Sequence, residues 1–131
     1  MRGIDPAAFA VQWAAAWNDR DLARVLEHFT DDVTFSSPKA LETVGRVTVR
    51  GKAALRGYWE RALGRVETLR FDVVRALWDP VRSEIGIVYD REVNGRRDRA
   101  IELLRFGADG RIVAGEVLYG LSVEGAEAGK R

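Results

Sequence analysis

The chain has 131 residues, of which 47% are hydrophobic and 31% are charged, and its 21 Lys and Arg side chains nearly balance 20 Asp and Glu. This size and composition fit one globular domain with no membrane-spanning apolar run, and the interspersed charges exclude a basic nucleic-acid-binding surface. With no cysteine and one histidine, the chain offers no disulfide and no thiolate or histidine-rich metal site, and no cofactor is expected.

The two ends of the chain indicate its location and its domain limits. The N-terminal MRGIDPAAFAVQW lacks the long apolar core and small-residue cleavage site of a secretory signal, so we expect a cytoplasmic protein. The C-terminal VEGAEAGKR is small and polar, which predicts a flexible tail at residues 123–131. Residues 1–122 are therefore interpreted as a single domain.

Helical spacing of apolar residues predicts helices in the first half of the chain. The first begins at Asp5-Pro6, where aspartate can cap and proline suits the first helical position, and it ends near Asn18. The second, short and amphipathic, covers residues 21–29, and the third begins at Gly51. The inward stripes of the first and third helices carry Trp13, Trp17, Tyr58 and Trp59.

Between the second and third helices, the segment FTDDVTFSSP reads as a turn followed by a short strand. Val33 and Phe35 alternate with polar residues, while Pro38 holds Ser37 in an extended conformation and cannot donate to a sheet. The strand is therefore expected to stop at Ser37. Residues 39–50 are expected to be irregular, with one small strand in GRVTV.

Alternating segments in the last half of the chain predict four antiparallel strands: LRFDVVRALW, SEIGIVYDREV, RDRAIELLRF and RIVAGEVLY. Asn94-Gly95 between the second and third of these is a strong hairpin signal, because both central residues of a type I′ turn need positive φ. A two-residue turn there pairs Ile87 with Glu102 and places Tyr89 on the same face of the sheet.

Both faces of this sheet are predicted to be apolar. The face opposite to Glu102 holds Val88, Ile101 and Leu103 beside charged residues. Because the helices can cover only one face, we expect a homodimer through the outer face.

Helices followed by a curved antiparallel sheet predict an α+β fold, in which the sheet wraps around the N-terminal helices as an open cone. Cone mouths of this kind are common ligand sites. The residues expected to line it and to bind a small hydrophobic molecule are Trp13, Trp17, Tyr58, Trp59, Ile87, Tyr89, Val117 and Tyr119.

The segments WAAAWNDRDLARVLEHFTDDVTFSSP, VRGKAALRGYWERAL and IELLRFGADGRIVAGEVLYG resemble the nuclear-transport-factor-2-like superfamily. Within it, the chain is similar to small bacterial SnoaL-like and ketosteroid-isomerase-like proteins over about residues 9–120. The resemblance implies a cone-shaped, cystatin-like fold. It implies no single activity, because this fold hosts isomerases, dehydratases, cyclases, epoxide hydrolases and members that only bind.

The resemblance to the isomerase branch also implies site positions. That branch uses a general-base aspartate before the proline that ends the first strand, a tyrosine on the first helix and a protonated acid on the penultimate strand. These positions hold Ser37, Trp13 and Glu102 in this chain, so only the acid keeps its chemistry. Because a serine hydroxyl does not remove a carbon-bound proton unless it is activated, the ketosteroid isomerase reaction is not expected.

Glu102 and His28 are the candidate acid and base. A carboxyl among apolar groups favours its neutral form and can donate a proton, although the same residue also suits a purely structural buried acid. His28 is the one histidine, the residue type most often used as a base near neutral pH, and it faces either the cone or solvent. Arg91 and Asp98, paired near the hairpin tip, are interpreted as an exposed ion pair of little energetic weight.

Two functions remain open at this point. The first is binding of a small apolar molecule with cofactor-free proton transfer of the isomerase, dehydratase or cyclase type. In it, Glu102 is the acid, His28 the base, and Ser37 and the Trp13 N–H are the orienting groups. The second is a non-catalytic ligand-binding or dimerisation module. An open cavity that reaches Glu102 favours a ligand role, and a cavity closed by the tryptophans excludes it.

Overall fold

The computed structural model describes residues 4–122. Within them the helices are α1 (Pro6–Asn18), α2 (Leu22–Leu26), α3 (Pro38–Val44) and α4 (Lys52–Leu63). The strands are β1 (Phe29–Ser36), β2 (Thr48–Arg50), β3 (Leu69–Asp79), β4 (Glu84–Val93), β5 (Arg96–Phe106) and β6 (Ile112–Ser122). The tail predicted for residues 123–131 lies outside the described residues.

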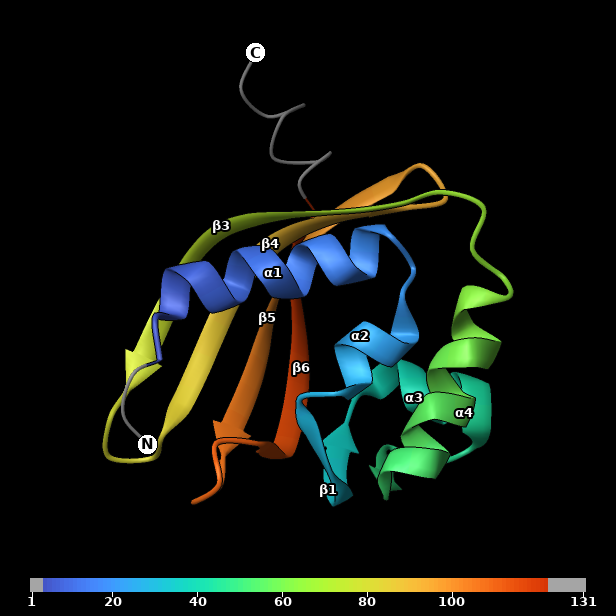
Figure 1. The fold of residues 1–131 in the computed structure, drawn as a ribbon. Coiled ribbons are helices and arrows are strands. Elements are labelled where there is room, and N and C mark those ends of the chain that lie inside the picture. The colour runs from blue at the N-terminus through green and yellow to red at the C-terminus, as the bar shows by residue number, and fades with distance from the viewer. Residues whose placement is uncertain (1–3, 123–131) are drawn as a thin grey trace.

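The strands of the described residues form one six-stranded sheet in the order β2-β1-β6-β5-β4-β3. Neighbouring strands run antiparallel, except that β1 and β6 are parallel. Figure 1 shows the sheet curling behind α1, while α2, α3 and α4 gather beside β1. This arrangement is the predicted α+β cone, with its open side between α1, the second group of helices and the concave face of the sheet.

The hairpin between β4 and β5 has the predicted turn and register. Asn94 and Gly95 have φ angles of 52° and 83°, which a type I′ turn requires. Ile87 pairs with Glu102, as the two-residue turn predicts. Because alternate residues of a strand face the same side, this register places Tyr89 and Glu102 together on the concave face.

Aromatic contacts of α1 hold the helix against the sheet and against α4. Asp5 caps the first turn of α1 as predicted. Trp13 stacks on Phe71 of β3 with ring centroids 5.6 Å apart, and Trp17 meets Trp59 of α4 edge-on at 4.9 Å. All four rings are buried, so the tryptophans contribute to the core as well as to the concave side.

The helix α2 is shorter than predicted. It ends at Leu26, and Phe29 begins β1 instead of completing the helix. Phe29 pairs with Ile112 of β6, and the Ile112 amide donates to the His28 carbonyl at 2.7 Å. This pairing with β6 satisfies backbone hydrogen-bonding groups that another turn of helix would otherwise satisfy, so α2 ends early.

Residues 39–50 were predicted to be irregular apart from one small strand, and this is wrong for residues 39–44, which belong to α3. Ser37 is extended, as expected before a proline, and its Oγ caps the helix by accepting the Lys39 amide at 3.2 Å. Gly45 ends the helix with a φ of 82°. Pro38 therefore ends one element and begins the next, because proline suits the first helical position.

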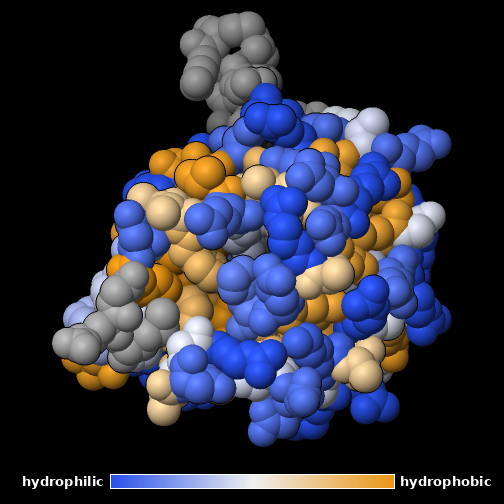
Figure 2. Space-filling view, in the orientation of Figure 1, coloured by the Kyte–Doolittle hydropathy of each residue, from blue (hydrophilic) through white to orange (hydrophobic). Residues whose placement is uncertain are grey.

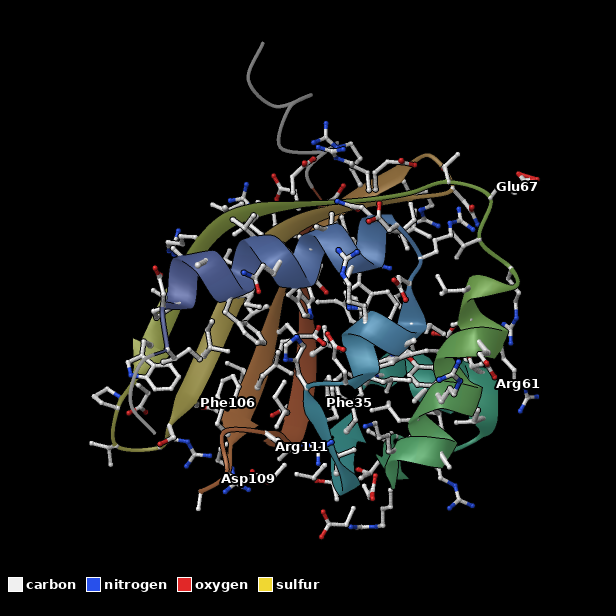
Figure 3. The ribbon with its side chains drawn as sticks, viewed as in Figure 1. Phe35, Arg61, Glu67, Phe106, Asp109 and Arg111 are labelled. Carbon is white, nitrogen blue, oxygen red and sulfur yellow. The ribbon has the colours of Figure 1, made fainter. Side chains whose placement is uncertain are left out.

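The two faces of the molecule differ in how the sheet is covered. On the inner side, Phe35 and Phe106 point between sheet and helices, whereas Arg61 projects from α4 toward solvent (Figure 3). On the outer side, Leu77 and Leu118 remain 50% and 47% exposed. Figure 2 views the helical side, where hydrophilic side chains are mixed with small apolar patches. None of the helices in residues 4–122 is long and apolar enough to cross a membrane.

Candidate functional site

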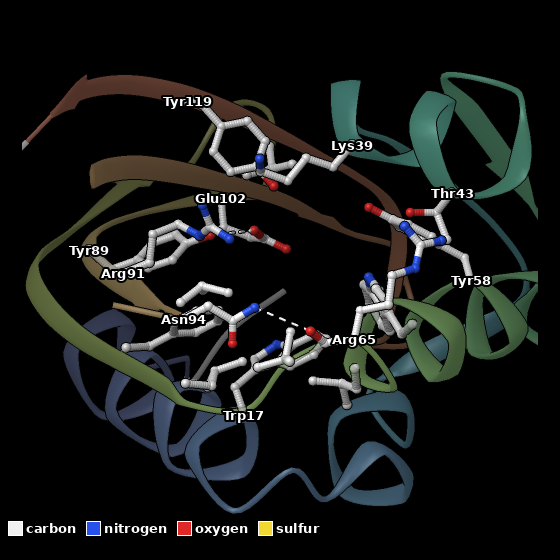
Figure 4. A pocket seen from close by; sticks show the side chains of 18 of the residues that line it. Trp17, Lys39, Thr43, Tyr58, Arg65, Tyr89, Arg91, Asn94, Glu102 and Tyr119 are labelled. Atoms are coloured by element: carbon white, nitrogen blue, oxygen red, sulfur yellow. Dashed lines mark hydrogen bonds between the residues drawn. The ribbon is translucent and has the colours of Figure 1, made fainter. Parts of the chain in front are cut away.

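A cavity of about 350 Å³ opens between the concave face of the sheet and the helices α1, α3 and α4 (Figure 4). Most of the side chains predicted to bind a ligand line it: Trp13, Trp17, Tyr58, Trp59, Tyr89, Val117 and Tyr119. Glu102 lines it as well. Ile87 does not, because it is fully buried at 0% exposure behind the lining. The tryptophans therefore form walls of an open cavity and do not close it.

Glu102 is a buried carboxyl that faces this cavity. Its side chain points into the open centre in Figure 4, although the residue is only 5% exposed. The Tyr89 hydroxyl donates to Glu102 Oε1 at 3.3 Å. Burial raises the pKa of Glu102 from 4.5 to about 8, against smaller opposing effects of the Tyr89 hydrogen bond and the Arg91 charge. At neutral pH the carboxyl is therefore mostly protonated and can give a proton to a ligand.

Two further tyrosines place hydroxyl groups near Glu102. Tyr58 comes from α4 and Tyr119 from β6, and burial raises the pKa of both phenols. The Glu102 carboxyl contributes to each increase, because a nearby negative charge disfavours a phenolate. Both tyrosines therefore stay neutral around neutral pH and act as hydrogen-bond donors rather than as bases.

Ser37 lies behind these tyrosines and not on the cavity wall. It is 1% exposed, and Tyr58 donates its hydroxyl proton toward Ser37 Oγ at 3.5 Å. The same oxygen caps α3. The prediction that Ser37 touches the ligand is therefore wrong. In this position Ser37 orients the phenol of Tyr58.

His28 is not brought to the Glu102 cavity. It is exposed in the turn between α2 and β1, and its ring packs edge-on against Phe9 with centroids 5.5 Å apart. It borders a separate pocket with Gln12 and Glu27. A ligand beside Glu102 has no contact with this imidazole, so the prediction of His28 as the general base is wrong for this cavity.

Arg91 was predicted to form an exposed ion pair, but it lies at the cavity. Its Nη1 does lie 3.1 Å from Asp98 Oδ1, as the hairpin register predicts. However, the Arg91 side chain is only 13% exposed and lines the cavity, and its guanidinium lies 4.9 Å from the centre of the Tyr119 ring. The signal was present in the sequence, because Arg91 follows Tyr89 by two residues and so shares its face.

Lys39, Glu42 and Arg65 also line the cavity and were not predicted. Lys39 and Glu42 belong to α3, which was read as irregular chain, and Arg65 follows α4. Their positions depend on how the helices pack on the sheet, which local sequence patterns do not define. No group of three His, Cys, Asp or Glu side chains able to hold a metal ion occurs in the part of the chain that the structure describes.

The indole nitrogen of Trp17 adds a polar feature that sequence reasoning missed. Among the described residues, it is a buried donor without a hydrogen-bond acceptor. An unsatisfied buried donor costs about 1–3 kcal/mol. Since Trp17 lines the cavity, the unsatisfied donor belongs to the candidate site.

Comparison with known proteins identifies the family. The sequence profile of the SnoaL-like domain matches residues 10–115. The chain belongs to the SnoaL-like family. A SnoaL-like protein of unknown function from Burkholderia thailandensis is 30% identical over 88% of this chain and 99% of its own, with a TM-score of 0.77.

More distant structures show the same fold. TerC, co-crystallised with polyporic acid, is 17% identical over 97% of this chain and 100% of its own, with a TM-score of 0.73. A protein from Catenulispora acidiphila with a ketosteroid isomerase-like fold, in complex with trimethylamine, is 21% identical over 95% of each chain, with a TM-score of 0.68. Other neighbours are described as NTF2-like or cystatin-like. No curated protein matches the chain.

Proposed function

We propose that this SnoaL-like protein binds a small, largely apolar molecule in the Glu102 cavity and transfers a proton to it without a cofactor, in an isomerase, dehydratase or cyclase type of reaction. The observation that carries the proposal is Glu102 itself, a carboxyl that burial keeps protonated at the wall of an open cavity. Structural neighbours carrying polyporic acid and trimethylamine support small-molecule binding by this fold.

A single buried carboxyl can serve both halves of such a reaction. In its neutral form Glu102 gives a proton to an oxygen of the ligand, and once ionised it accepts a proton from a neighbouring carbon. Tyr119 supplies a hydroxyl donor that stabilises negative charge on the same oxygen. This division of roles needs neither an aspartate at position 37 nor a histidine at the cavity.

The test begins with a thermal-shift screen of a metabolite library, followed by mass spectrometry to detect conversion of the compounds that stabilise the protein. For a converted compound, Glu102→Gln should lower kcat by about a hundredfold or more, because the amide keeps the shape but cannot give up a proton. Glu116→Gln, an exposed acid of β6, is the matched control and should leave kcat unchanged. Unchanged turnover in Glu102→Gln would contradict the proposal.

A non-catalytic ligand-binding role is the second candidate. It is favoured by Ser37 at the position where the isomerase branch holds its base, and by the distance of His28 from the cavity. In that case, compounds from the screen raise the melting temperature but are recovered unchanged. The cytoplasmic location remains a prediction from the sequence.

A further inference from the structure

The lining of the cavity carries an excess of positive charge. Among the described residues, the cations that line it are Lys39 of α3, Arg65 after α4 and Arg91 of β4, and the acids are Glu42 and Glu102. Burial raises the pKa of Glu102 to about 8, so Glu102 carries little negative charge at neutral pH. Three basic side chains and two acidic ones, of which Glu102 is mostly neutral, therefore line a largely apolar space.

Two of these cations converge on one aromatic ring. Lys39 Nζ lies 4.7 Å from the centre of the Tyr119 ring, and the Arg91 guanidinium lies 4.9 Å from the same centre. Figure 4 shows them reaching this ring from α3 and from the sheet, next to the Glu102 carboxyl. A ring quadrupole attracts each cation weakly, but it does not cancel the repulsion between two like charges.

The two cations are only partly neutralised by protein groups. Arg91 uses Nη1 for both of its contacts with Asp98, at 3.1 and 3.3 Å. Within residues 4–122, no carboxylate lies within 4.0 Å of Lys39 Nζ. An anion next to Tyr119 would gain charge-assisted hydrogen bonds from both side chains in a site that is partly shielded from water.

The opposite side of the cavity suits an apolar group. Trp17, Trp59 and Phe71 present ring surfaces there and are each no more than 8% exposed. Flat rings of this kind bind aromatic or polycyclic apolar groups with little loss of side-chain freedom. The cavity is thus divided into a cationic side at Tyr119 and an aromatic side at α1 and α4.

We propose that the natural ligand is an apolar, ring-containing molecule with one anionic group, such as a carboxylate, and that Lys39 and Arg91 bind this group while Trp17 and Trp59 bind the apolar part. The inference rests on the proposed function and narrows its ligand to a chemical class. It also predicts how pH affects binding, because the anionic group lies beside Glu102.

The groups that face Glu102 are Tyr89 and Arg91 from β4, Tyr58 from α4 and Tyr119 from β6. The pKa of each of these phenols is raised, and a guanidinium keeps its charge. Among these side chains, Glu102 is therefore the one that titrates near pH 8. Its ionised form repels an anion. Affinity for an anionic ligand should therefore fall as the pH rises through about 8.

The test compares 2-naphthoate with its uncharged isostere 2-naphthamide by isothermal titration calorimetry at about pH 6.5 and about pH 9. The naphthoate should bind more tightly than the amide at the lower pH and weaken at the higher pH. Lys39→Gln should raise the Kd of naphthoate about tenfold and leave the Kd of naphthamide unchanged. Arg61→Gln removes the same charge from the solvent side of α4 (Figure 3) and should change neither.

The possible results separate this inference from the proposed function. Equal affinities for the two compounds, with no effect of Lys39→Gln on naphthoate, overturn the anionic class and leave a ligand-binding cavity intact. If neither compound binds, both the anionic ligand class and the ligand-binding role fail.

The variant Glu102→Gln tests the origin of the pH dependence. Naphthoate binding to this variant should persist at low pH and no longer depend on pH. A pH dependence that persists in the variant overturns the role given to Glu102.

Discussion

Glu102 is held in the fold as a neutral acid at a cost in stability. The carboxyl receives one hydrogen bond, from Tyr89, in a setting that is otherwise largely apolar. Removing a carboxylate from water disfavours its charged form. The Tyr89 hydrogen bond and the charge of Arg91 together do not compensate for the lost hydration. A residue optimised for stability alone would be apolar here, which supports the acid role that we propose for Glu102.

The raised pKa of Glu102 makes a prediction about stability and pH. Between 4.5 and about 8, the folded protein keeps this proton and the unfolded chain releases it. The free energy of unfolding contributed by Glu102 therefore falls as the pH rises through this window. Glu102→Gln removes the effect, so the variant should match the wild type near pH 4 and be more stable by on the order of a few kcal/mol near pH 8.

Urea denaturation of both proteins at several pH values measures this difference. All other titrating groups are shared by the two proteins, so they cancel in the comparison. A difference between variant and wild type that stays constant from pH 4 to about pH 8 would show that Glu102 is ionised in the folded state. Such a result would remove the basis for Glu102 as an acid at neutral pH.

At the scale of elements, α3 connects the fold to the site. Ser37 directly follows β1, caps α3 and accepts a hydrogen bond from Tyr58, while the same short helix carries Lys39. Ser37→Ala should lower the free energy of unfolding by about 1–2 kcal/mol, through loss of the cap and of an acceptor for a buried hydroxyl. It should also weaken ligand binding, because the Tyr58 phenol at the cavity wall loses its orientation.

Ser36→Ala is the matched control for this change. Ser36 shares one hydrogen bond with Thr48, at 2.9 Å between the hydroxyl oxygens, so its loss should cost about 0.5 kcal/mol without any effect on binding. Chemical denaturation and calorimetric titration of both variants measure the two effects. If the two alanine variants prove equally stable and bind equally well, Ser37 is an ordinary turn residue.

Helix caps and turns that depend on a few adjacent residues could be predicted from the sequence. Element ends that depend on contacts with distant residues could not. The caps of α1 and the Asn94-Gly95 hairpin follow from backbone preferences of a few adjacent residues. The early end of α2 depends on Phe29 pairing with Ile112, a partner 83 residues further along the chain. The helix α3 had a local signal in Ser37-Pro38, which was interpreted only as the end of a strand.

The site was predictable to the extent that it lies on regular elements. The hairpin register placed Glu102 and Tyr89 on one face, and the helical stripes identified Trp17 and Trp59. Lys39 was missed because its position depends on packing of α3 against the sheet, and the location of His28 depends on where α2 ends. The chemistry of the cavity therefore follows partly from local sequence and partly from tertiary structure.

For the whole molecule, the outer face of the sheet is the surface on which we predict an interface. Leu77 and Leu118 are about half exposed on it, next to Val88 and Ile101. The Asp90–Arg99 ion pair, 2.7 Å between Oδ1 and Nε, lies on the same face. A face that carries apolar residues beside both charge signs can complement a second copy of itself across a two-fold axis, so a homodimer remains our prediction.

Light scattering after size exclusion tests this prediction directly. The wild type should elute with the mass of two chains, and Leu118→Glu should elute as a monomer, because a charge in the centre of a two-fold interface meets its own copy and must be desolvated. Leu41→Glu is the matched control, since Leu41 is similarly exposed at 53% but lies on α3. A wild-type monomer, or a dimer that persists in Leu118→Glu and dissociates in Leu41→Glu, would show that the outer face is not the interface.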